Sequence, residues 1–353
     1  MVTTHREPAI TTLGAERRAE WDALVAREPT FGLLQSWGWG TFKERMGWRV
    51  VRVAAERDGA LVAGAQVLVK RLGPAAFAYV PRGPVGAWLD AGVANPLLSA
   101  VRRVAREHRA VVLRVEPASP ADSTAGSVMR SEGFRSGRGT NQPRATIIVD
   151  MADGSEQALA RMHQKARYNI RRAERQGVQV RLGGIEDLPA MHRMMQITGE
   201  RAGFRVRDLA YYRTQWETLA PTGCLRLFIA SHDGLDLAMN VSAIHGRIGA
   251  YLHGASANLR RDLNPNEYLM WDAMRWAESE GCTAFDLWGV PDEVGEAALA
   301  GEEVRVPERL EGLWGVYGFK RRMGQRVELY TPAHDLSRPS FLAPWVGRLA
   351  ASG

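Results

Sequence analysis

Cysteine and lysine are both scarce in this chain of 353 residues. The two cysteines, Cys224 and Cys282, form no CxxC pair, which argues against a disulfide framework and against a zinc site. We therefore expect a reduced environment and no metal. Lysine occurs only at positions 43, 70, 165 and 320, although Lys and Arg together number 46. A chain that uses arginine nearly everywhere retains lysine either by chance or where a compact ammonium is needed.

Long apolar runs are also absent. No stretch of the sequence is long enough to cross a bilayer, and the first residues, MVTTHREPAI, contain no apolar core of a signal peptide. These absences predict a cytoplasmic protein. Its net charge of +7 favours a polyanionic partner, namely nucleic acid, nucleotide phosphates or an anionic membrane surface. General basicity of an arginine-rich proteome is the alternative explanation.

The sequence contains an internal repeat. Residues 52–65 and 227–240 each read as two apolar runs joined by an Asp-Gly turn, which is the signature of a β-hairpin. In both halves an Ala-Tyr strand (78–83 and 250–255) follows, and then a helix, a strand that ends at proline, and a Gly-Phe-Arg/Lys segment. Because these features recur in one order, we interpret the chain as two copies of one unit.

This repeat predicts an α/β (α+β) fold of two tandem domains. We expect the first domain to span residues 1–149 and the second to span residues 150–326. The tail, residues 327–353, is expected to pack back on the first domain.

A basic amphipathic helix is predicted over residues 155–176. Asp153 and Glu156 resemble a capping box, and Gly177 is a favourable stop. One face is apolar, and the opposite face carries the basic residues Arg161, Lys165, Arg172 and Arg175. With few acidic neighbours, such a stripe favours contact with phosphate or RNA over a merely solvated face. Residues 294–310, which are acidic and interrupted by glycine, are predicted to form a loop beside the site.

The order of elements in each copy resembles the GNAT acyltransferase fold, in which two central strands separate and the acyl donor lies in the gap. The R-x-x-G-x-G loop that holds the diphosphate of coenzyme A in that fold does not follow a plausible strand here. Without that loop, the protein lacks the backbone amides at a helix N-terminus that would bind the diphosphate of coenzyme A. The sequence thus predicts a GNAT-like fold with a donor other than coenzyme A.

Five short motifs resemble those of the Fem (FemABX) family. That family uses aminoacyl-tRNA to build the interpeptide bridges of peptidoglycan. The resemblance covers nearly the whole chain and implies twin GNAT-like domains, in the manner of the shorter members that lack a coiled-coil arm. The motifs are Leu34-Gln35-Ser36-Trp37 with Lys43, YVPRGPV (79–85), the basic segment 165–177, Trp288-Gly289-Val290-Pro291, and Tyr317-Gly318-Phe319-Lys320.

The resemblance also implies roles for individual residues. Lys320 would stabilise the oxyanion formed when an amine attacks an aminoacyl ester, or grip the tRNA 3′ end, and Phe319 beside it would contact substrate. Arg135, at the matching place in the first copy, suggests that only the second copy carries this role. Glu116 is a candidate base, although the position favours a strand-end turn residue over that role. The expected acceptor contacts are Lys43, Arg207, Tyr211 and Tyr251, with Arg207 and Tyr211 spaced to share a helix face.

We therefore predict an aminoacyltransferase that transfers an amino acid from aminoacyl-tRNA to an amine of a peptidoglycan precursor, without cofactor or metal. The expected acceptor is UDP-MurNAc-pentapeptide or a lipid-linked precursor, and a lipid-linked acceptor would bring a monomeric cytoplasmic enzyme to the inner face of the membrane. The alternatives are a coenzyme A-dependent N-acyltransferase, a non-catalytic RNA-binding protein, and a Fem-like enzyme that acts on another amine. The sequence does not identify the amino acid.

Overall fold

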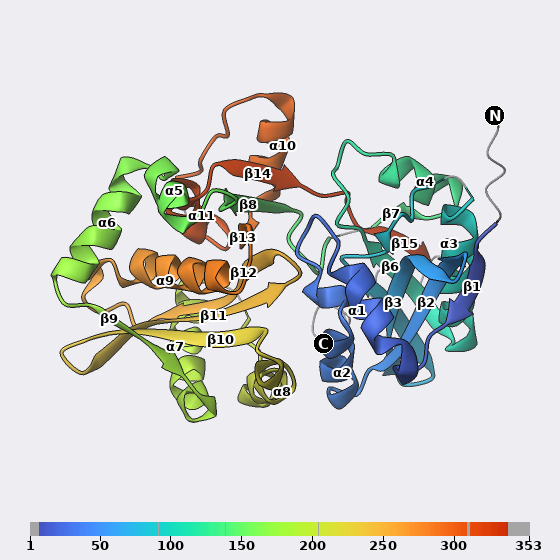
Figure 1. The fold of residues 1–353 in the computed structure, drawn as a ribbon, viewed down its shortest axis with the longest axis horizontal. Helices are drawn as coiled ribbons and strands as arrows, with labels where there is room; N and C mark the ends of the chain where they lie inside the picture. Colours follow the sequence, from blue (N-terminus) through green and yellow to red (C-terminus); the bar gives the residue numbers. More distant parts are fainter. Residues whose placement is uncertain (1–6, 91, 138, 204, 309–310, 338–353) are drawn as a thin grey trace. The chain divides into compact units, whose positions relative to one another are not determined.

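The computed structural model describes residues 7–337, except residues 91, 138, 204 and 309–310 (Figure 1). It is divided into two compact units, one made of Met1–Gln142 with Tyr330–Gly353 and the other of Pro143–Leu329. Each unit has one mixed sheet with helices against it, which confirms the predicted fold class. The predicted boundary between residues 149 and 150 falls at the end of a strand, Ala145–Asp150, that belongs to the second unit.

The sheet of the first unit has the strand order β1-β2-β3-β4-β6-β15-β7, and β5 pairs with β3. Helix α3 packs its buried leucines and valines on this sheet. The bounds of the strands are β1 Ala9–Thr12, β2 Arg49–Arg57, β3 Ala60–Leu72, β4 Ala75–Pro81, β5 Val85–Gly86, β6 Ala110–Glu116, β7 Arg135–Ser136 and β15 His334–Ser337. Those of the helices are α1 Arg18–Val25, α2 Trp37–Arg45, α3 Ala94–Glu107 and α4 Ala125–Ser131.

The sheet of the second unit has the order β14-β8-β13-β12-β11-β10-β9. Its core lies between this sheet and helices α5, α6, α9 and α11. The strands are β8 Ala145–Asp150, β9 Gln179–Gly183, β10 Leu225–His232, β11 Leu235–His245, β12 Ile248–Ser256, β13 Ala284–Val290 and β14 Arg326–Leu329. The helices are α5 Ser155–Arg161, α6 Gln164–Arg175, α7 Leu188–Ala202, α8 Leu209–Leu219, α9 Pro265–Ser279, α10 Asp292–Ala300 and α11 Trp314–Met323.

The two predicted hairpins are confirmed. Asp58 and Gly59 join β2 to β3, and Asp233 and Gly234 join β10 to β11. All four residues have positive φ angles, between 50° and 78°. This is the geometry of a type I′ turn, whose twist matches that of the two strands it connects.

The strands β8 and β15 define how the chain passes between the two sheets, and β15 lies in the tail that is expected to pack on the first domain. Strand β8 follows β7 in sequence, yet it pairs with β13 and β14 in the second sheet. Strand β15, near the end of the chain, pairs instead with β6 and β7 in the first sheet. A buried ion pair accompanies this arrangement, because both guanidinium nitrogens of Arg114 that face Asp335 donate to its carboxylate at 2.8 Å.

The predicted continuous helix over residues 155–176 is wrong, because α5 and α6 are separate helices. Met162 between them is extended and buried in the core. The amide of His163 donates to the carbonyl oxygen of Arg322 in α11 at 2.9 Å, and the His163 ring caps α6. The capping box is also absent, because Gly154 precedes α5 and has no side chain to cap it. Tertiary packing of Met162 thus interrupts the predicted helix.

Two further local expectations differ from the structure. Residues 292–300 form helix α10 rather than a loop, with Asp292 and Glu293 at its N-terminus, where acidic side chains stabilise a helix. Gly318, Phe319 and Lys320 lie inside α11, whereas Arg135 opens β7, as Arg326 opens β14. Arg135 is therefore not the structural counterpart of Lys320. The similarity of the two Gly-Phe-Arg/Lys segments therefore matched residues of a helix with the start of a strand.

We expect the Arg114–Asp335 pair to be important for the stability of the first unit. Asp335→Ala leaves a guanidinium that is only 5% exposed without its carboxylate. The free energy of unfolding should fall by about 3 kcal/mol, as when one partner of a buried pair is removed. Chemical denaturation measures this difference. Asp153→Ala is the matched control, because Asp153 is 75% exposed and its ion pair should contribute little. Equal stability of the two variants would contradict the role of Asp335.

Candidate active site

The central strands of the second unit separate. Strands β12 and β13 pair in parallel only through Ile248, Gly249 and Ala250 on β12. A register shift opposite Val241 marks a bulge in β12 beyond this point. Bulges bend a strand and end regular pairing. In the first unit, by contrast, β4 and β6 stay paired from Ala76 to Pro81. Among the described strands, the central parallel pair of the second unit therefore separates, whereas that of the first unit does not.

A cavity of about 460 Å³ lies in the second unit beside this gap. Its walls come from α7, β11, β12, the segment before α9, the start of α9 and one side of α11. Of the three arginines at the cavity, Arg322 donates to Glu267 at 2.9 Å. Arg201 and Arg261 make no ion pair with any residue that the structure describes. The cavity is thus polar and positively charged.

Lys320 occupies the gap between β12 and β13. The residue is 3% exposed, and its ammonium donates to the carbonyl oxygen of Gly289 at 2.7 Å and lies 5.4 Å from the centre of the Tyr251 ring. No carboxylate of the described residues lies within 4 Å of it. Burial lowers the pKa of Lys320 to about 7, and the charge of Asp286 opposes that shift. Near neutral pH this lysine can therefore be charged or neutral.

Tyr251 and Phe319 line the cavity next to Lys320. The Tyr251 side chain lies against Gly254, where a Cβ atom would be 1.5 Å from the tyrosine hydroxyl. Glycine at position 254 is thus required for this orientation of the ring. Burial raises the pKa of Tyr251 above its ordinary range, so its hydroxyl stays protonated at neutral pH. The structure therefore brings together three predicted site residues, Lys320, Tyr251 and Phe319.

The predicted pair Arg207 and Tyr211 is close in space. The expected cause, a shared helix face at a spacing of four residues, is wrong. Arg207 lies before α8, whose N-cap is Asp208, so the two residues do not share a helix face. The guanidinium nevertheless lies 5.6 Å from the centre of the Tyr211 ring, as in a cation–π contact. Tyr212 links this pair to His253, whose ring Nε2 donates to the side-chain oxygen of Gln215 at 3.0 Å.

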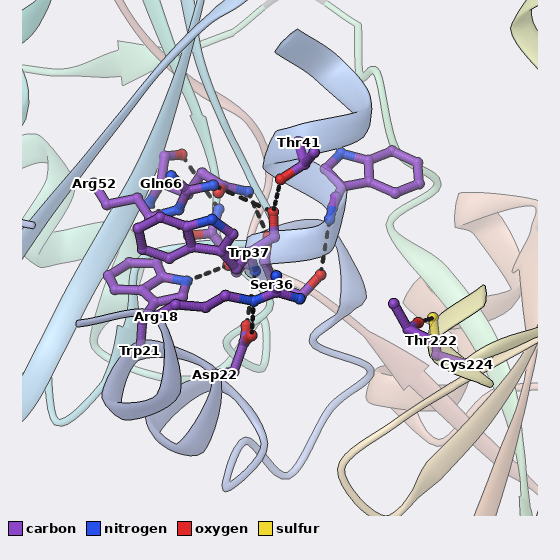
Figure 2. Close-up of polar contacts among 12 residues, drawn as sticks. Arg18, Trp21, Asp22, Ser36, Trp37, Thr41, Arg52, Gln66, Thr222 and Cys224 are labelled. Carbon is purple, nitrogen blue, oxygen red and sulfur yellow. Dashed lines mark hydrogen bonds and ion pairs between the residues drawn. The ribbon is translucent and has the colours of Figure 1, made fainter. Parts of the chain in front are cut away.

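Lys43 lies in the first unit, on α2. Its ammonium is near the rings of Trp39, Phe42 and Trp48, at 5.2, 5.0 and 5.9 Å from their centres. Figure 2 shows how the start of α2 is held. The Ser36 hydroxyl caps the helix, the amide of Trp37 donates to Asp22, and the guanidinium of Arg52 lies over the Trp37 ring.

Two glutamines complete the attachment of α2 to the sheet. The Gln66 side chain donates to the carbonyl oxygens of Leu34 and Ser36 at 3.1 Å each. The Gln35 side chain accepts from the backbone of Gln66 and donates to Pro81. The motif that resembled the opening of the Fem family is thus a buried hydrogen-bond network. It fixes the helix that carries Lys43.

Glu116 ends β6 in the first unit and is 5% exposed. Its carboxylate accepts from the Tyr79 hydroxyl at 2.5 Å and from the backbone amides of Asn141 and Gln142. Burial is the largest influence and raises its pKa, while these donors and two arginines oppose the rise. The carboxylate has several fixed donors, which is the environment of a structural anion. A role as base stays a prediction.

The basic residues of the predicted RNA contact lie mostly on α6. Lys165 and Arg175 are exposed and Arg172 is half-buried, with an intrahelical bond to Gln176. Tyr168 between them is 53% exposed. Arg161 lies on α5, where it donates to the Asp150 carbonyl oxygen and pairs with Asp153. The break between the two helices therefore separates Arg161 from the other three.

Several site residues escaped the sequence reasoning. Gly254, Asp286 and the cavity residues Arg201, Arg261 and Arg322 carry no motif of their own. Nothing in the sequence alone shows that three distant arginines share a cavity. Among the described residues no group of three or more His, Cys, Asp and Glu side chains could hold a metal ion. The same part of the chain contains no helix that is long and apolar enough to cross a membrane.

Comparisons with known proteins agree with this geometry. Residues 17–132 match the FemAB family, and residues 160–303 match an acetyltransferase (GNAT) domain. A Lipid II:glycine glycyltransferase of Staphylococcus aureus is 24% identical over 382 aligned positions, covering 86% of this chain and 88% of that protein. The chain is a member of the Fem family. It is a transferase of the Fem and GNAT type.

Solved structures show the same fold. The crystal structure of FemX superimposes with a TM-score of 0.80 at 22% identity, over 97% of this chain and all of FemX. A tandem GNAT protein from the clavulanic acid biosynthesis pathway gives a TM-score of 0.56 at 12% identity, over 94% and 98% of the two chains. In this Fem protein the longest described helices, α7 and α9, have 15 residues each, so no coiled-coil arm is seen in the described part.

The buried ammonium of Lys320 should lower the stability of this Fem protein at neutral and acidic pH. Its pKa is about 7 in the folded state and about 10.5 when unfolded, so the folded state binds fewer protons between these values. The free energy of unfolding therefore rises with pH between about 7 and 10.5 because of this group. The destabilisation caused by burying the ammonium is fully present below pH 7. Lys320→Met should raise the melting temperature at pH 6, and the gain should shrink towards pH 10.

Lys165→Met is the control for this experiment, because Lys165 is exposed and its substitution should give no pH-dependent difference. Thermal unfolding followed by circular dichroism at several pH values measures both variants. A Lys320→Met protein that is less stable than wild type at pH 6 would show that the buried ammonium does not destabilise the folded state.

Proposed function

We propose that this protein transfers an amino acid from aminoacyl-tRNA to a side-chain amine of a peptidoglycan precursor, forming an amide of the interpeptide bridge. The acceptor is UDP-MurNAc-pentapeptide or its lipid-linked form. A lipid-linked acceptor would bring a monomeric enzyme into peripheral contact with the inner face of the membrane. The observation that carries the proposal is the buried Lys320 beside a positively charged cavity.

A nucleic-acid donor is supported by the charge and shape of the cavity. Arg201 and Arg261 lack ion-pair partners in the described structure, and α9 opens at the same cavity without a side-chain cap. Uncapped amides at a helix start and unpaired guanidinium groups both bind phosphate oxygens. We place the 3′ end of the donor in this cavity, with the exposed basic residues of α6 as contacts for the rest of the RNA.

Coenzyme A is a poorer fit as donor. The segment between β12 and α9, residues 257–264, contains no glycine. A diphosphate loop needs close approach of several backbone amides, which glycines permit. A twin-GNAT acyltransferase that uses coenzyme A remains the second candidate.

The chemistry required of the protein is modest because the ester is already activated. The acceptor nitrogen attacks the ester carbonyl carbon, a C–N bond forms, and the carbonyl oxygen becomes an oxyanion. The C–O bond to the ribose then breaks, and the ribose oxygen takes the proton that the amine loses. The Lys320 ammonium would stabilise the oxyanion. The proton could pass through the neighbouring ribose hydroxyl or through Glu116.

Two basic residues are the proposed acceptor contacts, and each is described within its own unit. Lys43 offers an ammonium for a diphosphate, and its helix is fixed by the network around Gln35 and Gln66. Arg207 offers a planar fork for phosphate oxygens beside the Tyr211 ring. The curated relative from Staphylococcus aureus is named for a lipid II substrate, which supports a peptidoglycan precursor as acceptor.

Binding of tRNA should depend on α6. The double substitution Arg172→Glu with Arg175→Glu should weaken tRNA binding and reduce its salt dependence, because fewer counterions are released. Filter binding at several salt concentrations measures both quantities. Arg103→Glu with Arg106→Glu on α3 makes the same charge change at exposed positions and should have a smaller effect. Acetyl-CoA turnover that ribonuclease does not affect would contradict an RNA donor.

The acceptor contact at Arg207 should show in the Michaelis constant. Arg207→Lys keeps the charge and loses the fork, so the KM for UDP-MurNAc-pentapeptide should rise roughly tenfold while the KM for aminoacyl-tRNA stays near wild type. Steady-state kinetics with one substrate saturating separates the two constants. Arg213→Lys, an exposed residue of α8, is the control. Wild-type acceptor kinetics for Arg207→Ala would exclude the contact.

Lys320 should act in the chemical step. Lys320→Met should lower kcat on the order of 100-fold with little change in acceptor binding, and Lys320→Arg should recover only part of it. Single-turnover transfer of labelled amino acid at saturating aminoacyl-tRNA measures the step. If Lys320 only grips the tRNA end, saturating donor would restore the wild-type rate, and the catalytic role would be rejected.

A further inference from the structure

The backbone next to Lys320 has an unusual conformation. Trp288 has a φ angle of +62°, a left-handed conformation that non-glycine residues rarely adopt. It lies where pairing between β13 and β8 shifts register, between Asp286 and Gly289. The turn at Trp288 leads directly into Gly289, whose carbonyl oxygen accepts from Lys320. The strained residue therefore sets the position of the only hydrogen-bond acceptor that the described structure gives Lys320.

Asp286 holds this turn. Its carboxylate accepts from the backbone amide of Trp288 at 2.7 Å, an arrangement in which an Asp side chain bonds its own backbone two residues on. The same oxygen accepts from the Thr146 hydroxyl on β8. Asp286 is 2% exposed, so the carboxylate and the ammonium of Lys320 share a poorly solvated region.

The other charged groups near Lys320 are engaged elsewhere or have the same sign. On α9, Glu267 pairs with Arg322, and on α6 the Arg167 side chain donates to backbone carbonyls of Ala160 and Met162. From β12 comes Tyr251, which is neutral near pH 7 because burial raises its pKa. Strand β8 contributes the neutral Thr146. On α11 itself Arg321 and Arg322 are cations. Asp286 is thus the acidic group placed to influence the ammonium.

We propose that Asp286 is a positioning residue for Lys320, which fixes the left-handed turn that presents the Gly289 carbonyl and supplies the negative charge that favours the ammonium form. The inference deepens the proposed function, because it explains how a buried lysine can remain a cation when an oxyanion develops. The test of this inference requires neither donor nor acceptor. The role of Asp286 can therefore be overturned while the transfer activity is confirmed, and the transfer activity can be overturned while the role of Asp286 is confirmed.

The scarcity of lysine makes a direct test practical. Protein grown with [13Cε]lysine gives signals from only the four lysines at 43, 70, 165 and 320, and each Lys→Arg variant assigns one of them by NMR. The pH titration of the Lys320 signal reports its protonation without substrates. Asp286→Asn keeps an oxygen for the Trp288 amide and removes the charge. Its Lys320 midpoint should be lower than that of wild type by about one pH unit or more.

Asp272→Asn is the matched control for the titration, because it removes one carboxylate from an exposed ion pair of the same unit. It should leave the Lys320 midpoint unchanged. An unchanged midpoint in Asp286→Asn, or an equal shift in both variants, would overturn the electrostatic part of the proposal.

The positional part has its own readout. Trp288→Gly allows a positive φ at no steric cost, so the turn no longer needs Asp286 to hold it. Asp286→Ala should therefore reduce the free energy of unfolding less in a Trp288→Gly background than in wild type. Equal losses would overturn the positional role. If Asp286→Asn alone does not fold, the same titration in the Trp288→Gly background gives the midpoint, with Trp288→Gly as its reference.

Discussion

The separation of β12 from β13 is the constraint on which the candidate site depends. Parallel strands that stay paired exchange hydrogen bonds and leave no room for a ligand or a side chain between them. Here the pairing ends after Ala250, and the bulge in β12 together with the turn at Trp288 carries the strands apart. Lys320 from α11 enters the space and replaces the missing ladder bond with one of its own, to Gly289.

The two units of the repeat differ at this place. In the first unit β4 and β6 remain paired to Pro81 and Glu116, and the position beyond them is filled by Glu116, Tyr79 and the backbone of residues 141 and 142. A carboxylate with several fixed donors makes that end of the sheet rigid. The same architecture thus gives a closed, hydrogen-bonded sheet end in one unit and an open, positively charged cavity in the other.

The first unit depends on a strand from the far end of the chain, whereas the second unit is continuous in sequence. Strand β8 is the first strand of the second unit, whereas β15 follows the second unit in sequence and pairs with β6 in the first sheet. The first unit therefore needs the end of the chain, including Asp335 as partner of the buried Arg114. The second unit, residues 143–329, is continuous and contains the cavity, Lys320 and Asp286.

Local patterns in the sequence predicted much of this fold. The Asp-Gly turns, the repeat and the order of helices and strands predicted two α/β units, because turn chemistry and periodicity act over a few residues. The motifs that carried the Fem resemblance predicted the family. The two Gly-Phe pairs gave a wrong prediction, namely that Arg135 corresponds to Lys320. Phe319 lies within a helix, whereas Phe134 precedes a strand.

What decided the site was contact between distant parts of the chain. By itself the sequence determined the identity of the scarce lysines, but not that Lys320 would be the buried one with a lowered pKa. That property comes from Gly289, Tyr251 and Asp286, which lie 31 or more residues away and meet Lys320 only because β12 and β13 separate. Burial, close approach at Gly254 and the left-handed Trp288 are properties of packing. The tertiary structure alone decides them, since no local sequence pattern encodes the distance between two strands.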